Sequence, residues 1–267
     1  MSRLISTDRA AAQDPELDPK RPTPSMLYKY RPITDETSRN RLRSILVQNR
    51  IYFPSRLNFN DPFDCRVPSF LNVNLRDLRR FLSQRLKGMG LAKTRGDARA
   101  MARTINLEQL RNDIQIDVDK AGILSLTERP ENLLMWGHYA SSHTGVCLEF
   151  AVSVHETFFG RAQPVVYSDK RPTFDPNGTE EENVEAALLT KSADWAYERE
   201  WRIIDQHIGK ANCPFPPELL TGIIFGSSIS GADRQQIRKW VSERGLRVSF
   251  YNAVLNEREW KLDVVSD

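Results

Sequence analysis

Residues 194–204 carry the side chains best suited to catalysis in this chain. Glu198, Glu200 and Arg202 stand at every second position, and a period of two places side chains on one face of a β-strand. At a rise of about 3.3 Å per residue, the two glutamates would lie about 7 Å apart, close enough for each to shift the pKa of the other. Two carboxylates beside an arginine predict a site for a cationic group. The structural alternative is an ion pair of Glu200 with Arg202 or Lys191.

Residues 134–150 add two imidazoles. Helical spacing places Met135, His138 and Tyr139 together, and His143 follows in the turn before a strand. His138 and His143 would therefore face a pocket with an aromatic wall, where imidazoles can exchange protons near neutral pH. The alternative is that both are ordinary, half-buried residues with hydrogen bonds. Their spacing does not put both on one helix face, so no metal site with Cys147 is predicted.

Ser125 and Thr127 form a third candidate group. In the strand expected over residues 123–127 they point to one face, and Leu124 and Leu126 point to the core. They either brace a site or are simply the outward polar positions of a half-buried strand.

A strongly basic segment lies between Leu75 and Arg103. It holds nine basic residues against Asp77 and Asp97, a local excess of seven positive charges. This segment would hold an anionic partner or a nucleic acid, or it is a solvated helix face without a partner. The basic residues are Arg76, Arg79, Arg80, Arg85, Lys87, Lys93, Arg95, Arg99 and Arg103.

The elements that position these residues follow from apolar periodicity and capping residues. A strand over 26–31 ends at Pro32, a helix capped by Asp35 or Thr37 follows, and a strand is expected at 51–53. Helices over 74–88, 97–105 and 106–122 would form a helical insert. From residue 123 onward short strands and helices alternate, including a helix over 180–193 and a strand over 198–204.

This order predicts an α+β fold: a mixed, largely antiparallel sheet with flanking helices. Residues 1–25, rich in proline and charge, are expected to be a flexible leader. Residues 26–267 would then form a single α+β domain with the helical insert over 74–122.

Composition bounds the function. The chain has 267 residues, 40% of them apolar, and a net charge of +3, so any nucleic-acid binding must be local. Its three cysteines are odd in number and far apart, which predicts a reducing cytoplasm and neither disulfides nor a clustered zinc site. No apolar run approaches the roughly 18 residues of a membrane helix, so no membrane contact is expected. The motifs of P-loop NTPases, Rossmann dehydrogenases, zincins and α/β-hydrolases are absent.

Four motifs in order resemble family 2971 of the bacterial domains of unknown function, over about Leu27 to Tyr251. They are Tyr28-Lys29-Tyr30-Arg31, residues 59–64, residues 136–140 and residues 195–202. The family name carries no activity. Its frequent company with bacterial conflict systems implies a toxin or a defence effector.

A more distant resemblance is to the ADP-ribosyltransferase fold, whose arginine class orders Arg, Ser-Thr-Ser and Glu-x-Glu as Arg31, Ser125-Leu126-Thr127 and Glu198-Arg199-Glu200 are ordered here. The resemblance implies NAD as the cofactor. Glu200 would hold the ribose 2′-hydroxyl and stabilise the oxocarbenium-like state, and Glu198 would orient the acceptor. Arg31 would meet the NAD phosphates or ribose, and Ser125 and Thr127 would brace the site. Tyr139 or Tyr30 would stack on the nicotinamide ring, with His138 beside them among the residues around NAD.

Two other functions remain open at this point. In a nuclease or phosphotransfer toxin, His138 and His143 would act as acid and base, and the basic helices would hold RNA or DNA. In a non-enzymatic sensor or partner-binding module, the basic insert would dock an anionic ligand and the Glu and His residues would be structural.

Overall fold

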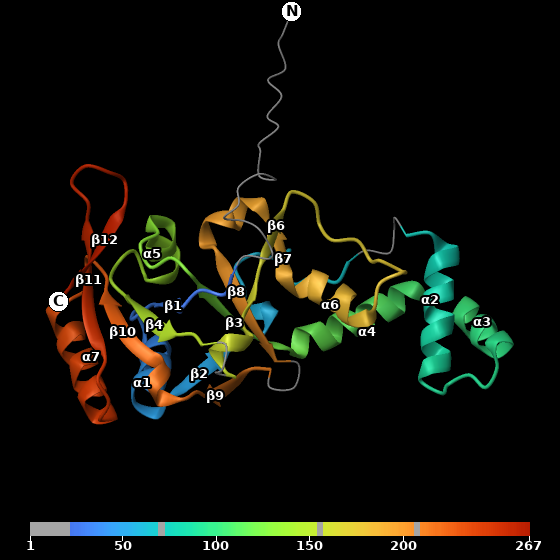
Figure 1. Ribbon diagram of the computed structural model, residues 1–267, viewed down its shortest axis with the longest axis horizontal. Coiled ribbons are helices and arrows are strands. Elements are labelled where there is room, and N and C mark those ends of the chain that lie inside the picture. Colours follow the sequence, from blue (N-terminus) through green and yellow to red (C-terminus); the bar gives the residue numbers. More distant parts are fainter. Residues whose placement is uncertain (1–21, 69–72, 154–156, 206–208) are drawn as a thin grey trace, which may run out of the picture.

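A mixed sheet forms the centre of the molecule. The computed structural model describes residues 22–68, 73–153, 157–205 and 209–267. Within these residues, eight strands form one sheet in the order β12-β11-β10-β4-β1-β3-β8-β5 (Figure 1). Of these neighbours only β10 and β11 pair parallel. The predicted α+β fold with a largely antiparallel sheet is therefore confirmed. In sheet order the strands are Leu262–Ser266, Ser249–Leu255, Leu220–Phe225, Val146–Ala151, Met26–Arg31, Gly122–Thr127, Glu200–Asp205 and Gln163–Pro164.

The two faces of this sheet carry different helices. On β4, Val146, Leu148 and Phe150 belong to the main core, whereas Cys147 belongs to a second cluster on the opposite face. The helices α1 (Glu36–Gln48) and α7 (Gly231–Arg244) pack on the main-core face, and α5 (Leu133–Tyr139) packs on the other. Short 3₁₀ helices connect the elements at Arg56–Asn58 (η3), Phe159–Arg161 (η4), Ala193–Glu198 (η5) and Pro217–Leu219 (η6).

The start of α1 follows the sequence prediction. The Asp35 side chain accepts a hydrogen bond from the Ser38 backbone, and Ser38 returns a bond to the cap, which forms a capping box. The helix ends at Asn49, which adopts the left-handed conformation with φ of 54°. These two ends fix α1 between β1 and β2.

Two further pairs of strands lie outside the main sheet. β2 (Arg50–Phe53) pairs antiparallel with β9 (Ala211–Pro214), and β6 (Val166–Ser168) pairs parallel with β7 (Thr190–Ser192). The predicted helix over 180–193 is wrong in its last turn, because α6 (Glu180–Leu189) ends where Thr190 becomes extended and joins β6. This ending matters for the site, since β7 carries Lys191.

The helical insert projects from one end of the molecule. α2 (Leu75–Gly88), α3 (Arg95–Thr104) and α4 (Leu107–Lys120) lie between β2 and β3 in the chain, at the end opposite the β11–β12 hairpin (Figure 1). Thr94, and not Asp97, caps α3, and the Asp97 side chain bonds back to the Thr94 backbone to complete a capping box.

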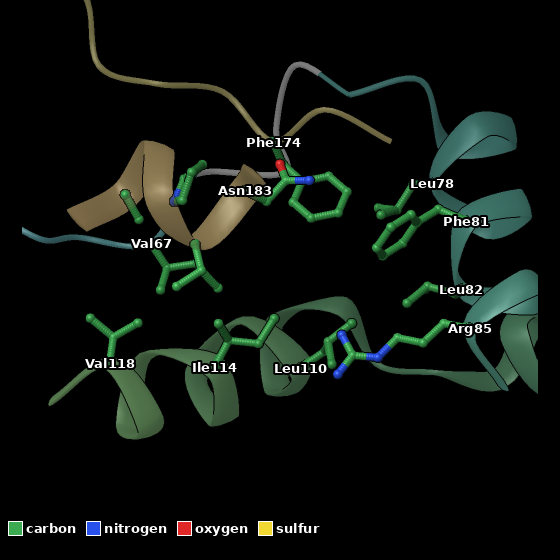
Figure 2. A pocket seen from close by; sticks show the side chains of 13 residues that line it. Val67, Leu78, Phe81, Leu82, Arg85, Leu110, Ile114, Val118, Phe174 and Asn183 are labelled. Atoms are coloured by element: carbon green, nitrogen blue, oxygen red, sulfur yellow. The ribbon is translucent and has the colours of Figure 1, made fainter. Parts of the chain in front are cut away.

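A small apolar cavity lies where the insert meets α6 (Figure 2). Its volume of about 30 Å³ is roughly that of one water molecule, so it is a packing gap rather than a ligand site. Arg85 lines this cavity and reaches from α2 towards Leu110 of α4. The sequence groups Arg85 with the basic patch, but the structure places it in this apolar contact.

The expected leader falls mostly outside the described residues, which begin at residue 22. In the part of the chain that is described, no helix is long and apolar enough to cross a membrane.

Candidate active site

A cavity of about 230 Å³ lies on the face of the sheet that carries α5. Strands β1, β3 and β8 form its floor, and α5, η5 and the loop from Pro54 to Asp64 form its walls. The residues that line it are Tyr28, Lys29, Tyr30, Pro54, Asn58, Phe59, Asn60, Asp64, Ser125, Leu126, Thr127, Met135, Tyr139, Lys191, Glu198 and Glu200. The cavity thus brings together six of the eight residues of the predicted site. Tyr30, Ser125, Thr127, Tyr139, Glu198 and Glu200 line it, and Arg31 and His138 do not.

The two glutamates of the predicted site reach the cavity from different elements. The prediction of one strand through both is wrong, because Glu198 ends the 3₁₀ helix η5 and β8 begins at Glu200. Arg199 between them is left-handed, with φ of 47°, and this turn breaks the alternation of the strand. Each glutamate is only 3% exposed, and both side chains contact the Lys191 amine.

Arg202 anchors the carboxylates from the floor of the site. Its side chain is completely buried, and it forms a two-bond pair with each of two acids. The bonds to Asp64 measure 2.9 and 2.7 Å, and those to Glu200 measure 2.8 and 2.9 Å. Bidentate pairs of this kind fix the orientation of a carboxylate. Glu200 is therefore held in place and is not free to turn towards a ligand.

Lys191 completes the cluster from β7. Its amine donates to Oε2 of Glu198 and, at 3.2 Å, to Oε2 of Glu200, and it lies 3.6 Å from Oδ2 of Asp64. We call Asp64, Lys191, Glu198, Glu200 and Arg202 the charge cluster. It contains two cations and three carboxylates, so with every group ionised it carries one surplus negative charge.

The surroundings push the pKa values of the two glutamates in opposite directions. Burial acts to raise the pKa of Glu200, but the charges of Arg202 and Lys191 outweigh it and hold that pKa far below its usual range. For Glu198, burial dominates and raises the pKa, and Lys191 offsets only part of this effect. Carboxyl pairs with pKa values moved apart are typical of acid and base roles. Glu198 is thus the member of the cluster suited to gain and lose a proton.

Tyr139 and Asn60 hold Glu198 from the cavity side. The Tyr139 hydroxyl donates to Oε1 of Glu198 at 2.6 Å and accepts from the Asn60 amide at 3.2 Å. Burial, together with the neighbouring Glu198 charge, raises the pKa of the Tyr139 hydroxyl well above its usual range. The hydroxyl therefore stays protonated and acts as a donor.

Aromatic and apolar side chains form the remaining walls. Tyr28, Phe59 and Met135 line the cavity with Tyr139. The ring of Tyr30 packs edge-on against Trp136, with centroids 5.1 Å apart, and its hydroxyl donates to the Arg129 carbonyl at 2.8 Å. Tyr30 is thus a fixed wall, and the half-buried Tyr139 is the ring better placed to contact a ligand.

Ser125 and Thr127 lie on the floor of the cavity. Thr127 stands opposite both Tyr28 and Glu200 in the sheet. Its hydroxyl donates to the Glu198 carbonyl at 2.6 Å, which fixes the end of η5. The Ser125 side chain hydrogen bonds to Glu200 and helps to lower its pKa. Both residues position the glutamates.

Lys29 enters the cavity between β1 and β3. The amine of Lys29 donates to the Ser125 carbonyl at 2.6 Å. Burial lowers the pKa of this amine to about 7, and the positive charge of Arg31 contributes. Near neutral pH the amine therefore exists in both charged and neutral forms.

Arg31 and the histidines lie outside the lining of this cavity. Burial lowers the pKa of Arg31 to about 10, and its Nε and Nη2 have no hydrogen-bond partner among the described residues. His138 is exposed, with its ring beside Tyr139. His143 stacks on Trp136 at 6.3 Å between centroids, and burial lowers its pKa. Neither histidine lines the cavity that holds the two glutamates.

Several residues of the site are not picked out as functional by the sequence. From the sequence, Lys191 is considered only as an ion-pair partner of Glu200, and Lys29, Asn60 and Asp64 only as members of the family motifs. One signal was present: Lys29 is a charged residue between two tyrosines in an otherwise β-prone run. Within the described residues, no group of three or more His, Cys, Asp or Glu side chains is arranged to hold a metal ion.

Part of the chain is similar to a known family. Residues 135–203 match the family described as "Protein of unknown function (DUF2971)". This segment includes Met135, Tyr139, Lys191, Glu198 and Glu200, and thus one wall of the cavity and most of the charge cluster. No curated protein and no solved structure matches the chain. The matched segment therefore supplies part of the site, and Asp64 and the lining residues of β1 and β3 lie outside it.

Proposed function

We propose that the cavity binds NAD through its nicotinamide ring, and that the protein breaks the bond between nicotinamide and ribose to transfer ADP-ribose. The observation that carries this proposal is the surplus carboxylate, Glu198, on the wall of a cavity lined by aromatic rings. The proposal takes up the resemblance to ADP-ribosyltransferases, which itself stays a prediction.

The charge of the site suits a flat cation. A buried surplus negative charge is costly and is relieved either by protonation or by a cationic ligand. The nicotinamide ring of NAD is both flat and positively charged. The faces of aromatic side chains such as Tyr139 and Tyr28 also attract cations. An uncharged ring of the same shape would gain less from the cavity.

The reaction would use Glu198 twice. The bond from ribose C1′ to the ring nitrogen breaks, its electron pair stays with the nitrogen, and neutral nicotinamide leaves. Positive charge then develops on the ribose, and ionised Glu198 stabilises it. The acceptor forms its bond to C1′, and its proton passes to Glu198, whose raised pKa suits a general base.

This assignment differs from the roles that the resemblance implies. Glu200 is saturated by Arg202, Lys191 and Ser125, so we assign it to hold Lys191 and the floor of the site. Glu198 takes the part next to the ribose. Arg31 does not line the cavity, and the proposal gives it no contact with NAD.

Nicotinamide release from NAD, measured by chromatography, tests the proposal. The full chain should release nicotinamide, and Glu198→Gln should slow the release by about 100-fold or more, the usual contribution of a general base. Glu257→Gln, at an exposed position, is the matched control and should act like the wild type. Absence of NAD binding at millimolar concentration by calorimetry, or full activity of Glu198→Gln, would refute the proposal.

The same variants separate the other functions. Cleavage of RNA or DNA that is lost in His138→Ala and kept in Glu198→Gln would favour the nuclease toxin. As a toxin acting through NAD, the wild type should slow bacterial growth on expression, and Glu198→Gln should not. Growth inhibition that survives both substitutions would favour a partner-binding module.

A further inference from the structure

The helical insert carries a cationic groove that the proposed NAD site does not use. It lies between α2 and α3, at the far end of the molecule from the β11–β12 hairpin (Figure 1), and has a volume of about 1120 Å³. Within the described residues, seven cationic side chains and no acidic one line it. We infer that this groove binds the phosphate backbone of a nucleic-acid duplex.

The cations form two facing stripes. Arg76, Arg80 and Lys87 follow one side of α2, and Arg95, Arg99 and Arg103 follow one side of α3. All six are exposed. At 1.5 Å per residue, the stripe on α3 is about 12 Å long. Three to four phosphates of one DNA strand occupy that axial length.

Most of these charges serve no visible structural purpose. Arg79 also lines the groove, but it donates to the carbonyls of Ala102 and Ile105 and so holds α2 against α3. Arg80 pairs with Asp77 at 3.0 Å. For the other five cations of the stripes, the described residues provide no ion pair. Like charges four residues apart destabilise a helix, so the stripes lower the stability of the insert unless a polyanion covers them.

Charge is also segregated along the chain. The whole chain carries +3, and residues 75–103 carry an excess of +7, so the remainder carries −4. A polyanion would therefore be attracted to the insert and repelled by the rest of the molecule. Such a distribution sets the orientation in which the protein meets a nucleic acid.

The groove favours a duplex over a single strand. Proteins that bind single strands stack the bases on aromatic side chains, and in the part of the chain described here no aromatic residue lines this groove. Its contacts would be with phosphates, and these carry no sequence information. Binding should therefore be independent of base sequence and strongly weakened by salt.

Fluorescence anisotropy of labelled duplexes tests the inference. The full chain is titrated with a 20-base-pair DNA and a 20-base-pair RNA between 50 and 200 mM salt. With five phosphate contacts, affinity for DNA should fall by about 500-fold over this range, since the logarithmic slope is about −0.9 per contact. The DNA and RNA arms show which duplex is preferred.

The variant Arg76→Gln/Arg80→Gln/Arg99→Gln/Arg103→Gln should reduce the magnitude of the slope of log affinity against log salt concentration by about 3 to 4. Lys239→Gln/Arg258→Gln removes two exposed cations elsewhere and should leave it unchanged. Circular dichroism checks that the variants keep their helices. Glu198→Gln should bind duplexes like the wild type, so failure of this inference is distinguishable from failure of the NAD proposal.

Four results in the nucleic-acid assays, and a fifth with lipid vesicles, would overturn the inference. The four are no duplex binding at 50 mM salt, equal binding by the four-residue variant, tighter binding of a single strand, and displacement of the duplex by poly-glutamate at equal charge concentration. The last result would assign the groove to an acidic protein. Tighter binding to vesicles of anionic lipid would assign it to a membrane surface and would overturn the inference as well.

Discussion

Replacing Lys191 by methionine removes one of the two cations of the charge cluster at nearly constant volume. The Lys191 side chain is 4% exposed, so water cannot take its place at Glu198 and Glu200. At an effective dielectric constant of 20, two unit charges 3.2 Å apart attract by about 5 kcal/mol, and the desolvation of Lys191 opposes part of this. Removal of one partner of a buried ion pair typically costs about 3–5 kcal/mol. We expect Lys191→Met to lower the free energy of unfolding by this amount at pH 8.

The loss should depend on pH because Glu198 can take up a proton. Burial already raises the pKa of Glu198, and the loss of Lys191 raises it further. A carboxyl whose pKa is higher in the folded state stabilises that state at low pH, and this stabilisation is lost as pH rises through the folded pKa. The destabilisation of Lys191→Met should therefore be smaller at pH 5.5 than at pH 8.

Urea unfolding followed by circular dichroism, at both pH values, measures the effect. Lys170→Met, at an exposed position after β6, is the matched control and should change the free energy of unfolding by less than about 0.5 kcal/mol. Adding Glu198→Gln should restore part of the loss, because it removes the surplus charge. A cost of Lys191→Met below about 1 kcal/mol, the same cost at both pH values, or no rescue by Glu198→Gln would refute the reasoning.

Three further predictions follow from single contacts. The affinity of the cation N-methylnicotinamide, measured by calorimetry, should rise roughly tenfold as pH increases through about 7, because Lys29 loses its positive charge there. The variant Lys29→Met should bind this cation with no such rise in affinity, and a rise that persists in the variant would contradict the assignment. In the same urea assay, Gly145→Ala should lower the free energy of unfolding by about 2 kcal/mol or more, since the new Cβ would lie 2.2 Å from the Arg31 carbonyl oxygen. The control Gly137→Ala, in open space on α5, should be neutral or stabilising. Val118→Ile should fill part of the apolar cavity of Figure 2 and raise the free energy of unfolding by about 0.8 kcal/mol, and a lower melting temperature would show that the cavity cannot accept the added group.

Elements with strong local signals could be predicted from the sequence. The strand over 26–31 and the helix that Asp35 caps lie where periodicity and capping chemistry place them. The short strand β7 could not be predicted in the same way. Residues 180–193 carry a helical pattern, and the extended backbone of Thr190–Ser192 depends on pairing with β6, which is more than twenty residues away in the sequence. Pairing over that distance is a tertiary effect that overrides local propensity.

The candidate site likewise contains residues that could be predicted from the sequence and residues that could not. The sequence identifies Glu198, Glu200 and Tyr139 as residues able to take part in catalysis or binding, and these residues do share a cavity. The ion pairs of Glu200 with Arg202 and Lys191 are the structural alternative that the sequence offers, and both form. The contacts of Asp64 with Arg202 and of Lys191 with Glu198 could not be predicted, because they depend on the course of a loop and on the pairing of β7. The left-handed Arg199 also hides the geometry, since the alternation of residues 198–202 is that of a strand although the backbone turns.

The imbalance of the charge cluster separates a functional site from a structural one. Buried ion pairs contribute little net stability compared with apolar residues of similar volume, so five buried charged groups are not explained by stability alone. A cluster kept for packing would be expected to balance its charges, as the two cations Arg202 and Lys191 do with the two carboxylates Asp64 and Glu200. The surplus falls instead on Glu198, the member bonded to Tyr139 at the cavity wall. A ligand that brings positive charge to that wall completes the cluster, and for this reason the search for an activity should begin with cationic N-glycosides such as NAD.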